Sequence, residues 1–296
     1  MVLITGANGF LGYYLTGALL QKGVGVLGTG KGDCRLPFSG HPLFDYTRMD
    51  FTDPFAVDAT FEKYKPAFVV HAGAMSKPDE CELNQWDCYV TNVEGTLNLL
   101  ANAEEKDSFF ILISTDFVFD GKEGLYAEED LPGPVNFYGK SKAEAEEAVK
   151  EFKLDWAIVR TCLVYGDPGT GKQNILTVVK DKIENKQKYL VFDDQQRTPT
   201  YIGDLVNGII AIIEKKAKGI YHLSGKDILS PYEMALRTAA HLQLDPSYLQ
   251  KASAADFQQA AKRPPKTGLK IDKAKAQLGF EPLSFEEGLA QSFKKR

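Results

Sequence analysis

The sequence predicts an α/β fold in which a doubly wound parallel sheet carries helices on both faces. Two patterns predict it. Short β-branched runs alternate with helical patterns through the first half of the chain, as in parallel sheets with crossover helices. The expected strands are apolar at every position, which indicates that both faces of the sheet are buried. A third observation, a glycine-rich turn after the first strand, indicates a ligand site at the carboxyl edge of that sheet.

The elements follow from these periodicities in chain order. Strands are expected at residues 2–4, 24–27, 68–70, 109–113 and 156–159, and helices from the glycine turn to about 22 and over 55–64, 79–103 and 138–152. Pro54 favours the start of one helix, and the Glu/Ala/Lys composition of 138–152 favours another. Later elements are expected as helices at 175–186, 202–215, 231–241 and 285–293 and as a strand at 219–223.

Composition excludes several classes of protein. The chain has 296 residues and a formal net charge of −5, enough for a core that needs no disulfide. No apolar run approaches the roughly 20 residues of a membrane helix, and the N-terminal run is too short for a signal peptide, so a cytoplasmic protein is expected. The four cysteines have no CxxC spacing and no nearby histidine pair, which predicts free thiols and no metal site. Without a basic stripe interleaved with aromatic residues, nucleic acid is not an expected partner.

Glycines at positions 6, 9 and 12 follow the first strand and open the first helix. Their spacing is GxxGxxG, which allows a tight turn, a close approach of the backbone to a pyrophosphate and free N–H groups at a helix N-terminus. The turn therefore predicts a dinucleotide site. Its residues are Gly6, Asn8, Gly9, Phe10, Leu11 and Gly12.

The end of the second strand favours NADP over NAD. An NAD site usually has Asp or Glu there for the ribose 2′-hydroxyl, whereas this chain has the glycine-rich segment 28–32 followed by cations. Lys31 and Arg35 would attract a 2′-phosphate, and Asp33 between them would oppose it.

Tyr138 and Lys142 are spaced to share one helix face. An adjacent ammonium favours the phenolate and is expected to lower the tyrosine pKa from about 10 toward neutrality, as acid–base catalysis requires. The alternative is a surface tyrosine beside a solvated lysine. The strand 109–113 favours catalysis, because it delivers Ser114 and Thr115 at its carboxyl end.

Taken together, the motifs resemble the extended short-chain dehydrogenase/reductase superfamily. They are TGANGFLG (5–12), HAGA (71–74), STDFVF (114–119), YGKSK (138–142), RTCLVYG (160–166) and the closing segment 263–282. The resemblance implies a Rossmann domain over 1–165, to which 199–224 return. It also implies a smaller α/β C-terminal substrate domain, formed mainly by 166–198 and 225–296.

The resemblance also assigns roles to residues. It implies Thr115, Tyr138 and Lys142 as the catalytic triad, with Lys142 also on the nicotinamide ribose. Asp50 and Phe51 match residues beside the adenine, and Asn92 matches an asparagine that is either structural or catalytic. The remaining implied cofactor positions are His71, Ala72, Gly73, Ala74 and Ser114.

Within the superfamily the chain is similar to the dTDP-4-dehydrorhamnose reductases, through 114–121, the approach 135–139, Asp194-Gln195 and Pro199-Thr200. This similarity implies hydride transfer from NADPH to C4 of a 4-keto-6-deoxy sugar, with Tyr138 protonating the developing alkoxide. Polar positions after the fourth strand also match, at Ser76, Asp79 and Glu82. Two sugar-side positions depart from that pattern, where Leu163 replaces a tryptophan and Met75 a histidine.

Charge distribution adds candidates for an anionic nucleotide sugar. Acidic side chains outnumber basic ones over 1–150, and the reverse holds over 151–296. The basic half coincides with the expected substrate domain, which suggests Lys172, Arg197, Lys262 and Arg263 as contacts. The substrate-binding candidates are therefore Ser76, Asp116, Leu163, Lys172, Arg197, Lys262 and Arg263.

Alternative functions remain open at the level of the sequence. A sugar 4,6-dehydratase is disfavoured because Phe117 stands where those enzymes carry an acid. A nucleotide-sugar 4-epimerase would hold NAD tightly. The absence of an acid after the second strand argues against this alternative, because that acid usually binds the ribose of NAD. A regulatory subunit similar to the methionine adenosyltransferase beta subunit would share the segment 192–200 and bind NADP and a partner protein. The chain shows no exposed heptad seam, so monomer and homodimer both stay open.

Overall fold

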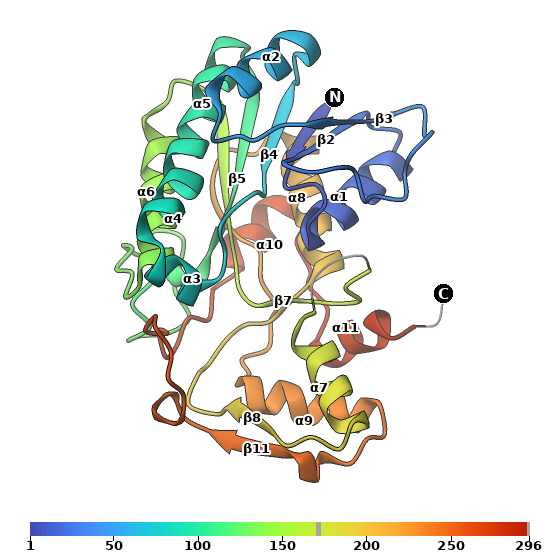
Figure 1. The fold of residues 1–296 in the computed structure, drawn as a ribbon, viewed down its shortest axis with the longest axis vertical. Coiled ribbons are helices and arrows are strands. Elements are labelled where there is room, and N and C mark those ends of the chain that lie inside the picture. The colour runs from blue at the N-terminus through green and yellow to red at the C-terminus, as the bar shows by residue number, and fades with distance from the viewer. Residues whose placement is uncertain (170–172, 295–296) are drawn as a thin grey trace.

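The computed structural model describes residues 1–169 and 173–294 and has a seven-stranded sheet at its centre (Figure 1). The strand order is β10-β6-β5-β4-β1-β2-β3, and all neighbours are parallel. The strands are β1 (Val2–Thr5), β2 (Val26–Gly30), β3 (Phe44–Arg48), β4 (Phe68–His71), β5 (Phe109–Thr115), β6 (Trp156–Thr161) and β10 (Gly219–His222). The order 3-2-1-4-5-6 is that of the Rossmann fold, so the predicted fold class is confirmed.

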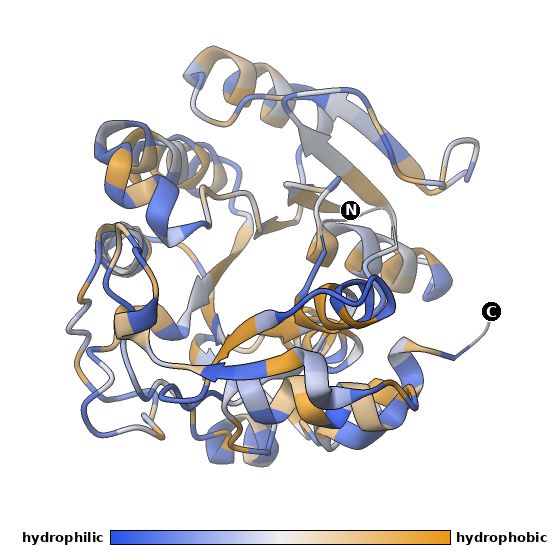
Figure 2. Ribbon diagram, turned by 60° about the horizontal axis from the view of Figure 1, so that its bottom comes forward, coloured by the Kyte–Doolittle hydropathy of each residue, from blue (hydrophilic) through white to orange (hydrophobic). Residues whose placement is uncertain are grey.

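Helices cover both faces of this sheet. One face packs against α1 (Phe10–Gln21) and α8 (Ile202–Lys215), and the other against α2 (Pro54–Tyr64), α5 (Gly95–Glu105) and α6 (Phe137–Glu151). Along β1, Val2 and Ile4 enter the first core and Leu3 enters the second. Burial on both faces explains why the strands are apolar throughout, and Figure 2 shows the hydrophobic residues along the strands and the helix faces turned toward them.

A smaller unit lies below the large sheet in Figure 1. Its helices α7 (Ile175–Glu184) and α9 (Pro231–His241) pack on a parallel pair formed by β8 (Tyr189–Phe192) and β11 (Leu249–Ala252). The helix α11 (Phe285–Ser292) packs against α9. By contrast α10 (Asp272–Leu278) returns to the large sheet, where it contacts α8 and β10.

Some elements differ from those expected from the sequence. The helix expected over 79–103 is interrupted at Asn84, whose φ of −129° and ψ of 61° are not helical. Its parts are α3 (Pro78–Leu83), α4 (Gln85–Tyr89), a π-helical turn (Val90–Glu94) and α5. The second strand runs on to Gly30 rather than ending at Leu27, because Gly28 pairs with Tyr46 and leaves room for the Ala7 side chain.

The sequence also missed several short elements. The edge strand β3 was not expected, because its side chains are half-buried and mixed in polarity. The strands β8 and β11 and the helix α10 were not expected either. Further unexpected elements are β7 (Val164–Tyr165) paired with β9 (Thr200–Tyr201), and 3-10 turns at Asp116–Val118, Pro246–Tyr248 and Ala254–Asp256. Within the described residues, no helix has both the length and the apolar character to cross a membrane.

Candidate cofactor and catalytic site

The glycine turn lies between β1 and α1, where side chains are sterically excluded. Gly6 has a φ of 66°, and a Cβ there would come within 2.9 Å of the Gly73 Cα atom. A Cβ on Gly12 would lie 2.5 Å from the Ala7 carbonyl oxygen. The cap residue Gly9 provides no side-chain acceptor, and the first turn of α1 carries no acid. This helix terminus can therefore receive the phosphate oxygens of a dinucleotide.

The cations expected near a 2′-phosphate lie at the end of β2. Lys31 Nζ is 3.1 Å from an Asp50 carboxylate oxygen, and both side chains are largely exposed. The Arg35 backbone N–H donates to Asn8 Oδ1 at 2.8 Å, which fixes this corner against the glycine turn. Asp33, the acid between the two cations, forms an ion pair with Arg48 on β3. Arg48 thus offsets the charge that opposes a 2′-phosphate.

Phe51 and His71, both expected beside the cofactor, are buried in the wall behind it. A Cβ on Gly73 or on Gly95 would lie 2.5 Å from the Phe51 ring, so the ring is wedged between these two glycines. His71 is 1% exposed and hydrogen-bonds Thr5 Oγ1 at 2.7 Å through Nδ1. Burial lowers the His71 pKa to about 3, so the ring stays neutral and acts as a structural link.

Asn92 joins the segment after β4 to α6. Its Nδ2 donates to the Met75 carbonyl and to Ser141 Oγ, both at 3.0 Å, and its Oδ1 accepts from the Met75 N–H at 2.8 Å. Ser141 directly precedes Lys142. These contacts favour the structural role of Asn92 over a catalytic one, and they fix Ala72–Ala74 relative to α6.

Two residues at the end of β5 have separate environments. Ser114 Oγ donates to Glu146 at 2.5 Å, and Glu146 forms a fully buried ion pair with Arg160 at 2.6 Å. Thr115 is 7% exposed, accepts from the Phe117 N–H at 3.2 Å and lies near enough to the Tyr138 phenol to affect its pKa. Of the two hydroxyls, the one on Ser114 is held by Glu146, so the one on Thr115 is left near Tyr138.

The start of α6 is pressed against the segment that follows β5. Asn136 caps the helix by accepting from the Gly139 N–H at 2.8 Å, and Glu82 accepts from the Phe137 N–H at 2.9 Å. A Cβ on Gly139 would lie only 2.1 Å from the Phe117 carbonyl oxygen. This close approach, which only glycine permits, brings Tyr138 to Thr115.

Tyr138 and Lys142 have opposite pKa shifts with a common cause. Burial raises the pKa of Tyr138 above its usual value of about 10, and the negative charge of Asp116 raises it further; Thr115 lowers this pKa where its hydroxyl donates to the phenol oxygen. Burial lowers the pKa of Lys142, which is 2% exposed, to about 8. The sequence predicted a tyrosine pKa lowered toward neutrality by the ammonium, and this is wrong for the structure because desolvation of the buried phenol raises it. The phenol is therefore protonated at neutral pH.

The substrate-side candidates have varied surroundings. Arg263 forms a two-point ion pair with Asp79, with contacts of 2.5 and 2.7 Å, which ties the closing segment to α3. Leu163 is 39% exposed and has a φ of 40°, an uncommon backbone conformation for leucine. Ser76 and Lys262 are exposed. Lys172 lies outside the described residues.

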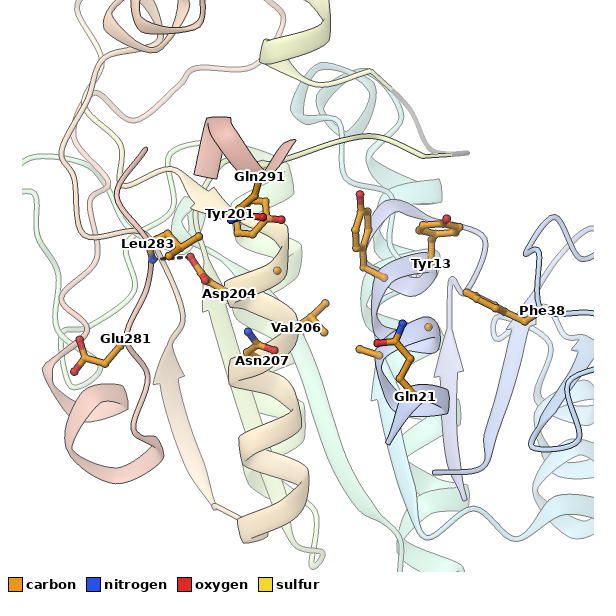
Figure 3. A pocket seen from close by; sticks show the side chains of 14 residues that line it. Tyr13, Gln21, Phe38, Tyr201, Asp204, Val206, Asn207, Glu281, Leu283 and Gln291 are labelled. Atoms are coloured by element: carbon orange, nitrogen blue, oxygen red, sulfur yellow. Dashed lines mark hydrogen bonds between the residues drawn. The ribbon is translucent and has the colours of Figure 1, made fainter. Parts of the chain in front are cut away.

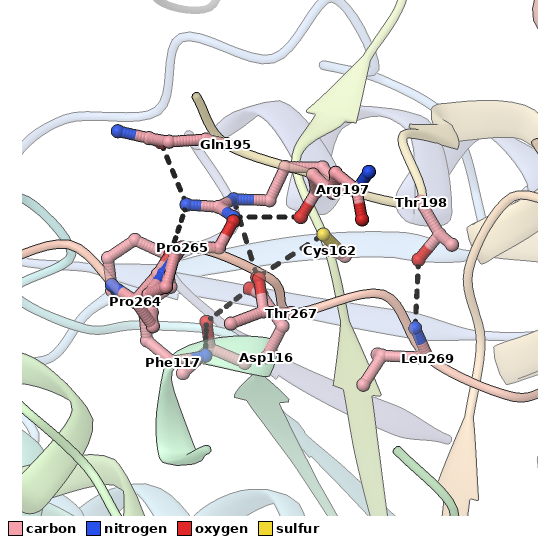
Figure 4. A network of polar contacts seen from close by, with 12 residues as sticks. Asp116, Phe117, Cys162, Gln195, Arg197, Thr198, Pro264, Pro265, Thr267 and Leu269 are labelled. Atoms are coloured by element: carbon pink, nitrogen blue, oxygen red, sulfur yellow. Dashed lines mark hydrogen bonds and ion pairs between the residues drawn. The ribbon is translucent and has the colours of Figure 1, made fainter. Parts of the chain in front are cut away.

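Arg197 and Asp116, both expected to contact substrate, are instead buried together (Figure 4). Arg197 is 3% exposed and lies beside Asp116. Its terminal N–H groups all have acceptors within the protein, so a direct contact with an anionic substrate does not fit this structure. These acceptors are Gln195 Oε1 and the carbonyl oxygens of Gln196, Pro264 and Pro265.

A separate cavity of about 640 Å³ lies between α1 and α8 (Figure 3). Tyr13, Phe38 and Tyr201 contribute aromatic walls, and Asp204 contributes a carboxyl group. Of the residues predicted for the cofactor, the substrate or the triad, none that the structure describes lines it. Within residues 1–169 and 173–294, no cluster of three His, Cys, Asp or Glu side chains could hold a metal ion.

Sequence reasoning missed three residues that hold the site together. Gly139 carried a signal, since glycine inside a helix is unfavourable unless another group approaches closely. Glu146 also carried one, because it lies one turn after Lys142 on the same helix face. Thr267, which donates to Asp116, carried none.

The sequence of this chain is similar to those of known proteins. Residues 1–296 match the family model described as RmlD substrate binding domain. A dTDP-4-dehydrorhamnose reductase of Aggregatibacter actinomycetemcomitans is 31% identical, with 97% of this chain and 96% of that protein aligned. Methionine adenosyltransferase 2 subunit beta of Xenopus tropicalis is 34% identical over 83% of this chain and 73% of that protein.

Solved structures agree with the family match. The dTDP-4-dehydrorhamnose reductase of Bacillus anthracis in complex with NADP superposes with a TM-score of 0.86, at 28% identity over 99% of this chain and 98% of that chain. The resemblance predicted from the motifs is confirmed by these matches.

Proposed function

The chain belongs to the RmlD substrate binding domain family, and on this basis we propose that it catalyses the NADPH-dependent reduction of the C4 keto group of a nucleotide-diphosphate 4-keto-6-deoxy sugar. The observation that carries the proposal is a protonated Tyr138 placed near Thr115 and one helical turn from the buried Lys142. Reduction of a ketone requires a proton donor at the developing alkoxide, and this pair supplies it.

Each triad residue has a defined task in this reaction. NADPH supplies the hydride when it is bound. Tyr138 holds the proton at its phenol oxygen and gives it to the substrate oxygen as negative charge develops there. Thr115 orients the phenol, and Lys142 offsets the charge of the phenolate that remains.

The cofactor preference follows from the corner at the end of β2. Lys31 and Arg35 would bind the 2′-phosphate, Lys31 from its place beside Asp50, and Arg48 holds Asp33 in an ion pair. The Bacillus anthracis relative, solved with NADP, supports this preference. We further propose that residues 1–165 and 199–224 hold the cofactor, while 166–198 and most of 225–296 hold the nucleotide sugar.

A turnover assay with a triad variant tests the proposal. Purified protein is mixed with NADPH and dTDP-4-keto-6-deoxy sugars, and NADPH oxidation is followed by absorbance. Tyr138→Phe should lower turnover by about 10²- to 10⁴-fold, because the general acid is lost, while NADPH affinity changes little. Turnover that persists in this variant would remove Tyr138 from the acid role.

The 34% sequence identity to methionine adenosyltransferase 2 subunit beta favours a second function, that of a regulatory subunit. Leu163, where the reductases carry a tryptophan, supports the same alternative. A protein of this kind would bind NADP and a catalytic partner without reducing a sugar. Absence of turnover with every keto sugar, together with a stable complex with a methionine adenosyltransferase catalytic subunit, would establish it.

A further inference from the structure

A buried polar network joins Asp116, the residue after Thr115, to the closing segment of the chain (Figure 4). Asp116 is 4% exposed, and its Oδ1 accepts from Thr115 Oγ1 at 3.1 Å. Its Oδ2 accepts from the Thr267 hydroxyl and, at 3.2 Å, from the Cys162 thiol. The Nε atom of Arg197 lies 4.0 Å from the same oxygen.

The Arg197 guanidinium is fixed by acceptors from two separate segments. Its Nη1 donates to the carbonyl oxygens of Gln196 and Pro265 at 2.8 and 3.1 Å. Its Nη2 donates to Gln195 Oε1 and to the Pro264 carbonyl oxygen, each at 2.8 Å. The terminal nitrogens are thus occupied, and the Nε edge is left for the Asp116 carboxylate.

The Thr115 hydroxyl has one proton and two partners that compete for it. A hydroxyl donates to one acceptor at a time, and an ionised carboxylate is a stronger acceptor than a phenol. With Asp116 ionised, Thr115 donates to Asp116 and accepts from the Tyr138 O–H. With Asp116 protonated, the carboxyl donates to Thr115, and Thr115 donates to Tyr138. The first arrangement keeps the phenol protonated, and the second stabilises the phenolate.

We propose that Arg197 is a positioning residue which keeps Asp116 ionised and thereby sets the direction of the hydrogen bonds from Asp116 through Thr115 to Tyr138. The proposal rests on the reduction proposed above, in which Tyr138 must begin protonated. It also gives the buried arginine a task other than substrate binding.

The electrostatics around Asp116 agree with this geometry. Burial raises the Asp116 pKa above its usual value, while the positive charge of Arg197 and the hydrogen bonds from Thr267, Cys162 and Thr115 lower it. Removing Arg197 leaves desolvation less opposed, so the carboxyl takes up a proton at a higher pH. Two charged or titratable groups face Asp116, namely Arg197 and Cys162. Those that face Tyr138 are Asp116, Cys81 and Cys88, and Lys142 lies one turn further along α6.

The pH dependence of turnover tests the proposal. Reduction needs protonated Tyr138, so kcat falls at alkaline pH as the phenol ionises. In Arg197→Gln and in the nearly isosteric Asp116→Asn, this alkaline limb should move to lower pH by about one unit, because the phenolate is then stabilised. Arg197→Lys keeps the positive charge, so its alkaline limb should lie close to that of the wild type. Arg263→Gln is the matched control, since it loosens the same closing segment without touching Asp116, and its limb should stay in place.

A second measurement does not depend on turnover. Tyrosinate absorbance is titrated in the wild type and in Arg197→Gln, and the corresponding titration in the Tyr138→Phe background is subtracted from each. The difference should show Tyr138 ionising at lower pH in Arg197→Gln. If the wild type turns over no keto sugar, the proposed reduction fails, while this titration still decides the role of Arg197.

Two outcomes would overturn the proposal. One is an equal loss of rate at every pH in Arg197→Gln with an unmoved phenol titration, which a purely structural arginine would give. The other is an unmoved limb in Asp116→Asn, the variant that carries the test if Arg197→Gln does not fold.

Discussion

Two regions of this site are built in different ways: the cofactor side, formed by the turn at 6–12 and the wall at 71–74, and the reacting side, formed by Thr115, Asp116 and Tyr138. On the cofactor side, the glycine turn and the wall that contains Gly73 are set by backbone positions at the ends of adjacent strands. On the reacting side, Asp116 is held by contacts from Cys162, Arg197 and Thr267, which come from three other parts of the chain. Dinucleotide binding is therefore encoded locally, whereas the reactivity of the phenol depends on tertiary contacts.

Among the changes that test this difference, Gly139→Ala should have the largest effect, because Gly139 brings the helix α6 against the segment that follows β5. In Gly139→Ala the added Cβ would lie 2.1 Å from the Phe117 carbonyl oxygen, so α6 or the 116–118 turn must shift. A displacement of about 1 Å between Thr115 and Tyr138 should lower kcat by about 100-fold. Steady-state kinetics with NADPH and a keto sugar measure it.

Gly133→Ala is the matched control for this effect. Its Cβ would meet the Asp120 Cβ at an ordinary 3.6 Å, so it should retain activity. Full activity in Gly139→Ala would show that the close contact does not position the tyrosine.

The next prediction tests whether the residues after β2 determine cofactor preference by themselves. Lys31→Ala or Arg35→Ala should weaken NADPH binding by about tenfold, the loss of one charge-assisted contact, and leave NADH binding unchanged. Fluorescence titration with both cofactors measures it, with Lys63→Ala on α2 as a control. Equal losses for the two cofactors would contradict the assignment of these cations to the 2′-phosphate.

The smallest effect concerns Asp204, which lines the cavity between α1 and α8, outside both sides. Burial raises its pKa to about 6, above the unfolded value of about 4. The folded protein binds that proton more tightly, so this contribution to stability is complete below pH 4 and is lost as the pH rises through 6. Asp204→Asn should therefore gain stability relative to the wild type between pH 5 and pH 8.

Urea unfolding at both pH values measures the Asp204 effect. We expect a gain of about 1 kcal/mol, because about half of the full linkage already acts at pH 5. The exposed Asp58→Asn serves as control and should show no such gain. A stability difference between Asp204→Asn and the wild type that is the same at pH 5 and pH 8 would contradict the linkage.

The sequence predicted best what short segments determine. The turn at 6–12 and the spacing of Tyr138 and Lys142 are defined within a few residues, and the strands of the central sheet other than the edge strand β3 are largely apolar. Arg197 was predicted to face substrate because its charge was visible in the sequence and its partners were not, since the Pro264 carbonyl it binds lies 67 residues away. The tyrosine pKa was predicted in the wrong direction because burial, a tertiary property, decides it.

The contact between Asp116 and Thr267 has a consequence for the order in which the protein is made. The two residues are separated by 151 positions, so a nascent chain emerging from the ribosome folds its first six strands before Thr267 exists. Until then Asp116 lacks this donor, and the carbonyl oxygens of residues 264 and 265 are not yet present to hold Arg197. Translation thus delivers the central sheet early and completes the surroundings of Asp116 only after residues 264–267 have been made.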